Sequence, residues 1–406
     1  AAALALLTAL APWTVWREVA RGIGNLWWYA GGAAATSALA IAWSQSFWVP
    51  TAKPTFEAVY HLLQWFIPTV HTDPASLIID TGRFAVSIDP VCSGLEGVGL
   101  MLAFGSALLL VFREEYNFPR ALLLLPGGVL LILALNVVRI AALVAIGHAG
   151  YGDVAVYGFH SQAGWIAFNC AAGAIALVSL RSRWFSRRAA PRSSVGRTNP
   201  TAVYLMPFLA FLSAGMVSRA TSSGFEHLYA LPAAAALVAL GYSWPRLHAL
   251  DWRFTWRGPA AGVGVFAAWI LATQLLPLSP DSRPGFGPTQ AWPHALWMTT
   301  RLATTLAVAP LTEELAFRGY LLRRLRHADF ESVRLRSAAG WPLVVSAVAF
   351  GLYHGGMWQP WIIAGLVYGL VFIRTERIGE SLAAHTTTNT LIAACVLSGI
   401  APSKFW

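Results

Sequence analysis

Long apolar runs recur along the whole chain, and short polar segments separate them. Several runs approach the ~20 residues that an α-helix needs to cross the hydrocarbon core of a bilayer. Shorter runs suit re-entrant segments or helices packed inside a bundle. The pattern predicts an all-α polytopic membrane protein, with candidate spans at Ala1–Val15, Trp28–Trp48, Leu95–Phe112, Ala121–His148, Ser161–Leu180, Ala202–Met216, Leu228–Tyr242, Ala260–Leu278, Ala295–Leu311, Trp341–Tyr353, Ile362–Ile373 and Leu382–Gly399.

Two polar segments divide this pattern. Within the first, Val49–Val91, the stretch SLIID-TG-RFAVSID (Ser76–Asp89) predicts two short strands around a Thr-Gly turn, a small hairpin above the membrane. The second, Arg181–Pro200, is basic, rich in Ser and Pro and without apolar periodicity, which is typical of a linker. We therefore expect a membrane domain over residues 1–184, a basic cytoplasmic linker over 185–200 and a second membrane domain over 201–406, each domain a bundle of about 5–7 helices.

Composition agrees with a membrane protein. Hydrophobic residues make up 57% of the chain and charged residues 11%, against about 25% charged in a soluble domain. The net charge of +10 comes from arginine clusters between apolar runs, so positive-inside topology explains it better than nucleic-acid binding, for which no motif is present. Five Arg-rich loops then lie in the cytoplasm and the alternate loops outside: Trp16–Gly22, Arg113–Arg120, Arg181–Arg197, Trp244–Arg257 and Arg318–Arg336.

The three cysteines, Cys92, Cys170 and Cys395, are odd in number and far apart, so they indicate no disulfide framework. Turn-forming residues flank Cys92 and a long apolar run follows it, which puts the thiol at the outer end of a helix. A helix N-terminus favours a thiolate. Taken alone, a cysteine such as Cys92 is more often a small buried residue. The lone thiols of Cys170 and Cys395, inside apolar runs, are interpreted as structural.

Two more polar residues are predicted near the same membrane depth as Cys92. Arg139 lies in the apolar run LNVVRIAAL, where a charge is costly unless it faces a partner or a cavity. His160 begins the next span, in YGFHSQAGW. A histidine can activate a thiol, and an arginine can stabilise an oxyanion. The set indicates acyl transfer to Cys92, although Arg139 could form a structural pair and His160 could be an ordinary interfacial residue.

The segments PVCSGLEG, NVVRI and FHSQAGW resemble the three active-site motifs of the exosortase/archaeosortase family of membrane cysteine transpeptidases. The resemblance covers roughly residues 1–184. It implies that Cys92 is the nucleophile, that Arg139 assists acyl transfer and that His160 is the third member, with no cofactor. It also implies exported protein substrates with a C-terminal motif, a transmembrane helix and a basic tail, cleaved on the outer face of a bacterial inner membrane.

A second polar set lies in the last third of the chain. The run LTEELAFRGYLLRRL holds Glu313 and Glu314, with Arg318 spaced to pair with Glu314 one turn later. His354 stands in FGLYHGG, and AAHTTTNTL places His385 and Asn389 four residues apart on one helix face. Helix capping and interhelical hydrogen bonds would explain one such residue. Six on three helices indicate a catalytic site, because intramembrane charge is costly.

These motifs are similar to those of the type II CAAX prenyl protease and bacteriocin-processing intramembrane proteases: Glu-Glu-x-x-x-Arg, Phe-x-x-x-His, and His-x-x-x-Asn or Asp. The resemblance implies that Glu313 and His354 activate water, that His385 and Asn389 stabilise the oxyanion, and that Arg318 organises the first helix with Glu314. A divalent metal such as Zn²⁺, with Glu313, His354 and His385 as candidate ligands, and a metal-free glutamate mechanism are both open. We expect this site toward the cytoplasmic half.

The fusion of the two regions resembles the exosortase E/protease type, which is associated with substrates carrying a Val-Pro-Glu-Ile-Asp sorting signal. The sequence therefore favours a bifunctional protein-processing enzyme in the lipid bilayer. The alternative is a transporter or channel whose polar path is lined by the same residues. Against it, the polar residues group by catalytic type in separate modules, and broken helices repeated in two related halves are not found.

Overall fold

A computed structural model describes the chain over residues 12–24, 52–88, 92, 94–187, 199–223, 225–275, 291–355 and 358–400, together with residues 28, 31, 32 and 35. The chain forms two compact units. One contains residues 25–197 with 216–228, and the other contains residues 1–24, 198–215 and 229–406. These units group residues by spatial contact. The predicted domains over residues 1–184 and 201–406 stay a prediction, and most of the predicted linker lies outside the described residues.

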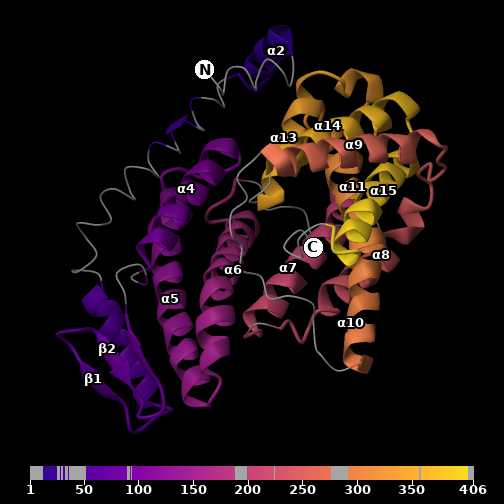
Figure 1. The fold of residues 1–406 in the computed structure, drawn as a ribbon. Coiled ribbons are helices and arrows are strands. Elements are labelled where there is room, and N and C mark those ends of the chain that lie inside the picture. Colours follow the sequence, from indigo (N-terminus) through magenta and orange to yellow (C-terminus); the bar gives the residue numbers. More distant parts are fainter. Residues whose placement is uncertain are drawn as a thin grey trace. The chain divides into compact units, whose positions relative to one another are not determined.

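Three long helices form the body of the first unit, and Figure 1 shows them side by side in purple and magenta. They are α4 (Leu95–Val111), α5 (Leu124–His148, preceded by the 3-10 turn η2, Arg120–Leu123) and α6 (His160–Arg181, preceded by the π-helical η3, Val154–Phe159). Glycines let α4 and α5 approach closely, since a Cβ on Gly97 would lie 3.0 Å from Ile132 and one on Gly128 would lie 2.9 Å from Met101. The bundle thus depends on small residues, as helices in lipid do.

A small sheet and a helix over residues 52–64 pack against the end of α5 in this unit. The strands β1 (His71–Asp73), β2 (Ile78–Asp80) and β3 (Ala85–Ser87) form an antiparallel meander. The predicted hairpin is confirmed as β2–β3, and β1 adds a strand that the sequence pattern did not indicate. Phe84 fits against Gly147, where a Cβ would lie 2.3 Å from the ring. This contact fixes the meander on the helix that carries Arg139.

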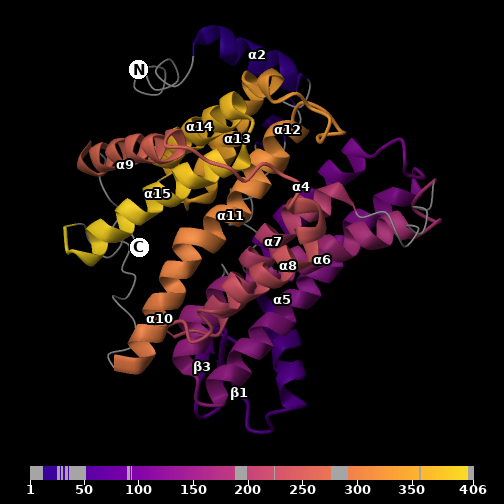
Figure 2. The ribbon, with the colours of Figure 1, turned by 90° about the vertical axis from the view of Figure 1, so that its right-hand side faces the viewer.

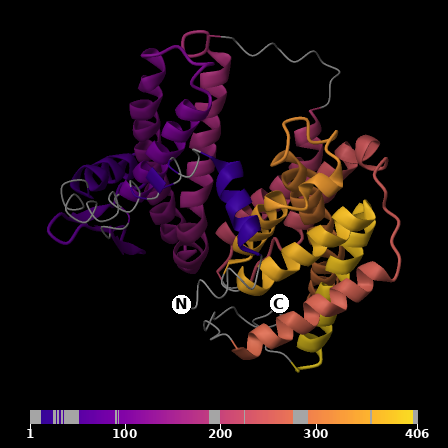
Figure 3. The same cartoon turned by 90° about the horizontal axis from the view of Figure 1, so that it is seen from above.

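The second unit is a helical bundle, drawn in orange and yellow with the end of the magenta range, together with the indigo helix α2 (Figures 2 and 3). Its elements are α2 (Trp13–Ile23), α8 (Leu231–Leu247), α9 (Arg257–Leu275), α10 (Ala291–Ala303), η4 (Thr304–Val308), α11 (Ala309–Glu314), η5 (Leu315–Leu321), α12 (Leu322–Arg324), η6 (Leu335–Ala338), α13 (Trp341–Tyr353), α14 (Trp358–Thr375) and α15 (Ile378–Leu397). Helix α7 (Pro200–Ala220) contributes residues to both units.

Two helix pairs in this bundle meet through glycines spaced four residues apart. On α14, a Cβ on Gly365 would lie 2.8 Å from the backbone of Ala347, and one on Gly369 would lie 2.3 Å from Leu343. On α9, a Cβ on Gly262 would lie 2.3 Å from the carbonyl oxygen of Ala384. Such spacing brings helix backbones together in a membrane. The close approach packs α14 against α13, which ends next to His354, and α9 against α15, which carries His385 and Asn389.

The carboxylate of Glu380, in the first turn of α15, caps the start of α9. One of its oxygens accepts hydrogen bonds from the backbone N–H and the hydroxyl of Thr255, at 2.9 and 2.7 Å. The other accepts from the backbone N–H of Gly258 at 2.8 Å. A buried carboxylate needs such donors, and a helix N-terminus provides them. Glu380 therefore ties the two helices together at their ends.

Three helical stretches among the described residues are long and apolar enough to cross a membrane: Arg120–His148, Val154–Arg181 and Pro200–Ala220. Leu95–Val111 and Trp341–Tyr353 are shorter apolar helices. The all-α polytopic class is therefore confirmed. The candidate span Trp28–Trp48, and most of Ala1–Val15, lie outside the described residues.

Of the loops expected from arginine clusters, Trp16–Gly22 is helical and Arg318–Arg336 is helical in its first part. Trp16–Gly22 lies within α2, because its apolar residues recur on one face, and Val15 and Trp16 pack on Val344. The helix that carries the paired glutamates continues to Arg324 before a loop begins. Arg318 and Arg323 of this helix are buried, while Arg324 is exposed. Arg323 donates to the carbonyl of Gly319 at 2.6 Å and lies over the rings of Tyr204 and Phe330. The arginine clusters in the sequence predicted polar loops here, because the sequence does not show which groups the arginines contact.

Candidate active sites

Cys92, Arg139 and His160 line one pocket of about 230 Å³ in the first unit. Cys92 lies just before α4, Arg139 comes from the middle of α5, and His160 begins α6. Gly164, one turn after His160, leaves room for Arg139, since a Cβ there would lie 3.1 Å from Nη1 of the guanidinium. The three side chains that carry a nucleophile, a cation and an imidazole thus face a common space.

The pocket is mixed in character. Glu96 and Ser161 contribute polar groups to its wall, while Ile132, Trp165 and Phe168 contribute apolar surface. All three cysteines of the chain lie among the described residues, and they carry thiols rather than a disulfide. Of the three, Cys92 is the one that borders the pocket.

Asn136 is a pocket residue that sequence reasoning did not single out. It is 8% exposed, and its Nδ2 donates a hydrogen bond of 2.9 Å to the backbone carbonyl of Cys92. A signal was present in the sequence: an amide three residues before Arg139 lies on the same helix face. It passed unnoticed because a single amide in an apolar helix has many possible partners.

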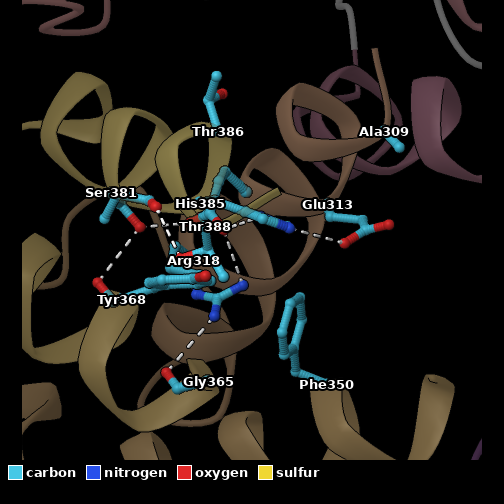
Figure 4. A network of polar contacts seen from close by, with 12 residues as sticks. Ala309, Glu313, Arg318, Phe350, Gly365, Tyr368, Ser381, His385, Thr386 and Thr388 are labelled. Atoms are coloured by element: carbon cyan, nitrogen blue, oxygen red, sulfur yellow. Dashed lines mark hydrogen bonds and ion pairs between the residues drawn. The ribbon is translucent and has the colours of Figure 1, made fainter. Parts of the chain in front are cut away.

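The second set of predicted residues gathers in the core of the second unit (Figure 4). Glu314 lies at its centre. Oε1 lies 3.0 Å from Nη1 of Arg318 and 3.0 Å from Nδ1 of His385, and Oε2 accepts a hydrogen bond from Ser381. All four side chains are almost completely buried. Arg318 pairs with Glu314 and not with Glu313, as the spacing predicted.

Aromatic rings enclose this network. The guanidinium of Arg318 lies 4.2 Å from the centre of the Phe350 ring and 5.3 Å from that of Tyr368, and it donates to the carbonyl of Gly365 at 3.4 Å. The ring of His385 stacks on Tyr368 with centroids 5.0 Å apart. Cation–π contacts and the carboxylate compensate the cost of burying the arginine. Ser381 and Tyr368 were not expected, because their sequence context looks like an ordinary apolar helix.

Glu313 faces the two histidines. Its Oε2 lies 3.8 Å from Nε2 of His354 and 3.8 Å from Nε2 of His385, and no hydrogen bond reaches this buried oxygen. Nδ1 of each histidine forms a hydrogen bond. Nδ1 of His354 lies 2.8 Å from the carbonyl oxygen of Phe350, and Nδ1 of His385 bonds to the carboxylate of Glu314. A carbonyl and an ion-paired carboxylate can only accept, so each Nδ1 carries a proton, and each Nε2 is an acceptor when its imidazole is neutral. The Nε2 atoms of both imidazoles therefore lie at the same distance from Oε2 of Glu313.

Asn389 makes a contact different from the expected one. Its Nδ2 donates to the carbonyl of Thr305 at 2.9 Å, and Thr386 donates to the neighbouring carbonyl of Leu306 at 3.0 Å. Both carbonyls belong to η4, the π-helical stretch before α11, where wider turns disturb the regular backbone hydrogen bonds. Asn389 thus holds the segment that leads to Glu313.

The predicted metal ligands can be tested against this arrangement. The donor atoms of Glu313, His354 and His385 have the right chemistry, since carboxylate and imidazole bind Zn²⁺. Their placement does not form a ready site: within the residues that the structure describes, no three His, Cys, Asp or Glu side chains are grouped so that they could hold a metal ion. Metal dependence of this site stays a prediction.

Comparisons with known families support a membrane-embedded role in protein processing. Residues 1–177 match the family described as "Transmembrane exosortase (Exosortase_EpsH)", and residues 295–391 match "Type II CAAX prenyl endopeptidase Rce1-like". The chain joins an N-terminal exosortase-family region to a C-terminal Rce1-like CAAX-protease region, as the motifs indicated. No curated protein and no solved structure matches the chain.

Proposed function

We propose that the chain is a bifunctional enzyme that processes exported membrane-anchored proteins. The first activity is transpeptidase or endopeptidase cleavage at a C-terminal sorting signal, of the Val-Pro-Glu-Ile-Asp type that the family resemblance suggests. The second is hydrolysis of a peptide bond in or near the membrane. The observation that carries the proposal is the pocket that Cys92, Arg139 and His160 share, although they come from three separate elements. A transporter does not require a thiol at that place.

At the first site, the thiolate of Cys92 attacks the carbonyl carbon of the scissile peptide. Arg139 stabilises the developing oxyanion with its fixed positive charge. His160 takes the thiol proton and returns it to the leaving amine as the carbon–nitrogen bond breaks. The resulting thioester on Cys92 then passes its acyl group to water or to an amine, and the thiol is regenerated.

At the second site, Glu313 acts as the base. A water molecule between Glu313, His354 and His385 would find three acceptors for its two protons, so an oxygen lone pair stays available to attack a carbonyl. Glu313 takes a proton from this water and delivers it to the leaving amine. Glu314 and Arg318 orient His385 and fix the helix that carries Glu313. This assignment gives His385 an acceptor role. The oxyanion role that the family resemblance implied would require the imidazolium.

The positive-inside pattern favours an outward-facing exosortase site and a protease site toward the cytoplasmic half of a bacterial inner membrane. In this arrangement the protease would act on the clipped helix and basic tail that remain after cleavage outside. Lipid and exported proteins are the proposed partners.

The deciding experiment uses the full chain and a co-expressed substrate that carries a motif, a transmembrane helix and a basic tail. Cys92→Ala should leave this substrate uncleaved and membrane-bound, while Cys170→Ala should process it normally. A thioester trapped on wild-type Cys92 would identify the nucleophile by mass spectrometry. Normal processing by Cys92→Ala would remove the first activity, and rapid loss of the released tail fragment in Glu313→Gln would remove the second.

A further inference from the structure

Asn136 connects the turn that holds the nucleophile to the helix that carries the cation. Its Nδ2 donates to the backbone carbonyl of Cys92 at 2.9 Å, and Arg139 follows on the same face of α5, three residues on. Asn136 is 8% exposed and lines the same pocket as Cys92 and Arg139. An amide in an apolar helix needs a partner, and a carbonyl outside regular helix needs a donor.

The start of α4 is shaped to receive this amide. Gly94, two residues after Cys92, has a φ of +86°, a conformation that glycine adopts without strain. A Cβ at Gly94 would lie 2.9 Å from Nδ2 and 3.2 Å from Cγ of Asn136, so the side chain lies directly against the glycine. The contact therefore depends on two features at once, the amide on α5 and the missing side chain on the turn.

A matching contact lies on the other side of Arg139. A Cβ on Gly164 of α6 would lie 3.1 Å from Nη1 of Arg139. Asn136 and Arg139 lie on the same face of α5. Asn136 contacts Gly94 near Cys92, and Arg139 contacts Gly164 of α6, the helix that begins at His160. The distance between thiol and guanidinium is then set by a rigid helical spacing.

We propose that Asn136 is a positioning residue that holds Cys92 in register with Arg139 and His160. The proposal rests on the proposed acyl-transfer function of this pocket. Asn136 acts through the Cys92 backbone, and without it the turn detaches from α5. The thiol then becomes more accessible to solvent while it loses its alignment with the other two residues.

The test uses the full-length protein with Cys170→Ala and Cys395→Ala, in which Cys92 is the single thiol. Two quantities are measured: the rate at which iodoacetamide alkylates Cys92 at pH 7, and kcat and KM for cleavage of the signal-bearing substrate. The variants are Asn136→Ala and the similarly sized Asn136→Asp, which cannot donate through a carboxylate. The matched control is Asn169→Ala, because the exposed Asn169 on α6 also donates to a backbone carbonyl, at 2.8 Å, and does not line the pocket.

Both Asn136 variants should be alkylated at least about fivefold faster than the parent, because a detached turn opens locally. Their kcat should fall by about tenfold to hundredfold with KM changed little, since misalignment affects the reacting atoms rather than binding. Asn169→Ala should match the parent in both quantities. A residue with only a packing role is not expected to raise the alkylation rate of Cys92 while it lowers kcat.

A second pair of variants keeps the test decisive where Asn136→Ala does not fold. Gly94→Ala should reproduce the same two changes from the other side of the contact, and Gly99→Ala, with no atom within 4 Å of its Cβ, should not. Alkylation or kcat of folded Asn136→Asp and Gly94→Ala within twofold of the parent would overturn the proposal. If the parent cleaves no signal-bearing substrate, the proposed function fails, while a fivefold change in alkylation would still establish that Asn136 holds the Cys92 turn.

Discussion

Nδ1 of His385 lies 3.0 Å from Oε1 of Glu314, the same oxygen that pairs with Arg318 at 3.0 Å. One carboxylate oxygen therefore orients the imidazole and neutralises the guanidinium. The neighbouring Glu313 is left with no such partner on Oε2. The two adjacent glutamates have different tasks because of this asymmetry: Glu314 holds the site together and Glu313 is available for chemistry.

Replacing Glu314 should damage stability as well as activity. Glu314→Gln leaves the guanidinium of Arg318 buried without its counter-charge, which costs about 3–5 kcal/mol. The control is Glu376→Gln, because Glu376 pairs with Arg336 at 3.8 Å on the surface, where such a pair contributes less than about 1 kcal/mol. Denaturant unfolding of the purified protein in detergent checks both values. Equal losses in the two variants would contradict the central role of Glu314.

Replacing Glu313 should affect activity far more than stability. Glu313→Gln removes the proposed base, while Oε2 accepts no hydrogen bond from the described residues that the substitution would break. Peptide hydrolysis at the second site should fall by at least about a hundredfold, with an unfolding midpoint close to that of the parent. Processing by Cys92 should continue, which separates the two activities. A variant that loses both activities together would argue for a single site.

Chelation distinguishes the two open mechanisms of the protease region. The proposed glutamate-base mechanism needs no metal, so we expect peptide hydrolysis to persist after treatment with 1,10-phenanthroline. The inactive 1,7-phenanthroline is the matched control reagent. Loss of hydrolysis that added Zn²⁺ restores would instead establish a metal-dependent mechanism, for which Glu313, His354 and His385 are the candidate ligands.

The pairing of α9 with α15 should fail when its glycine contact is filled. Gly262→Ala places a methyl group 2.3 Å from the backbone carbonyl of Ala384, so the helices must separate and core packing is lost, at a cost of about 1–3 kcal/mol. Gly264→Ala on the same helix has open space around its Cβ and should be neutral or stabilising by up to about 1 kcal/mol. Thermal unfolding of the two variants gives the comparison, and equal midpoints would contradict it.

The cap that Glu380 places on α9 should be sensitive to the loss of its charge. Glu380→Ala removes the acceptor for three hydrogen bonds from Thr255 and Gly258 and leaves the buried backbone N–H of Gly258 without an acceptor, at a cost of about 1–3 kcal/mol. Glu380→Gln keeps one oxygen acceptor and should lose less. The exposed Glu331→Ala is the control. The free energy of unfolding should be highest for the parent, lower for Glu380→Gln and lowest for Glu380→Ala.

The sequence by itself determined the class of protein and the residues of interest. Apolar periodicity placed α4, α5, α6 and α13 close to their observed bounds, because long apolar runs have few alternatives to a buried or membrane helix. The spacing of Glu314 and Arg318 gave their ion pair, because an i, i+4 contact depends on local geometry alone. Rare polar residues in apolar runs marked both sites for the same energetic reason.

Only the tertiary structure decided which groups meet across helices. The contact of Asn136 with the Cys92 carbonyl, the contact of Asn389 with Thr305 and the capping of α9 by Glu380 join residues far apart in the chain. None has a local signature, since an amide or a carboxylate in an apolar helix has many possible partners until neighbouring helices fix its surroundings. Glycine contacts set that helix spacing, because they decide how closely two backbones approach, and so which side chains reach one another.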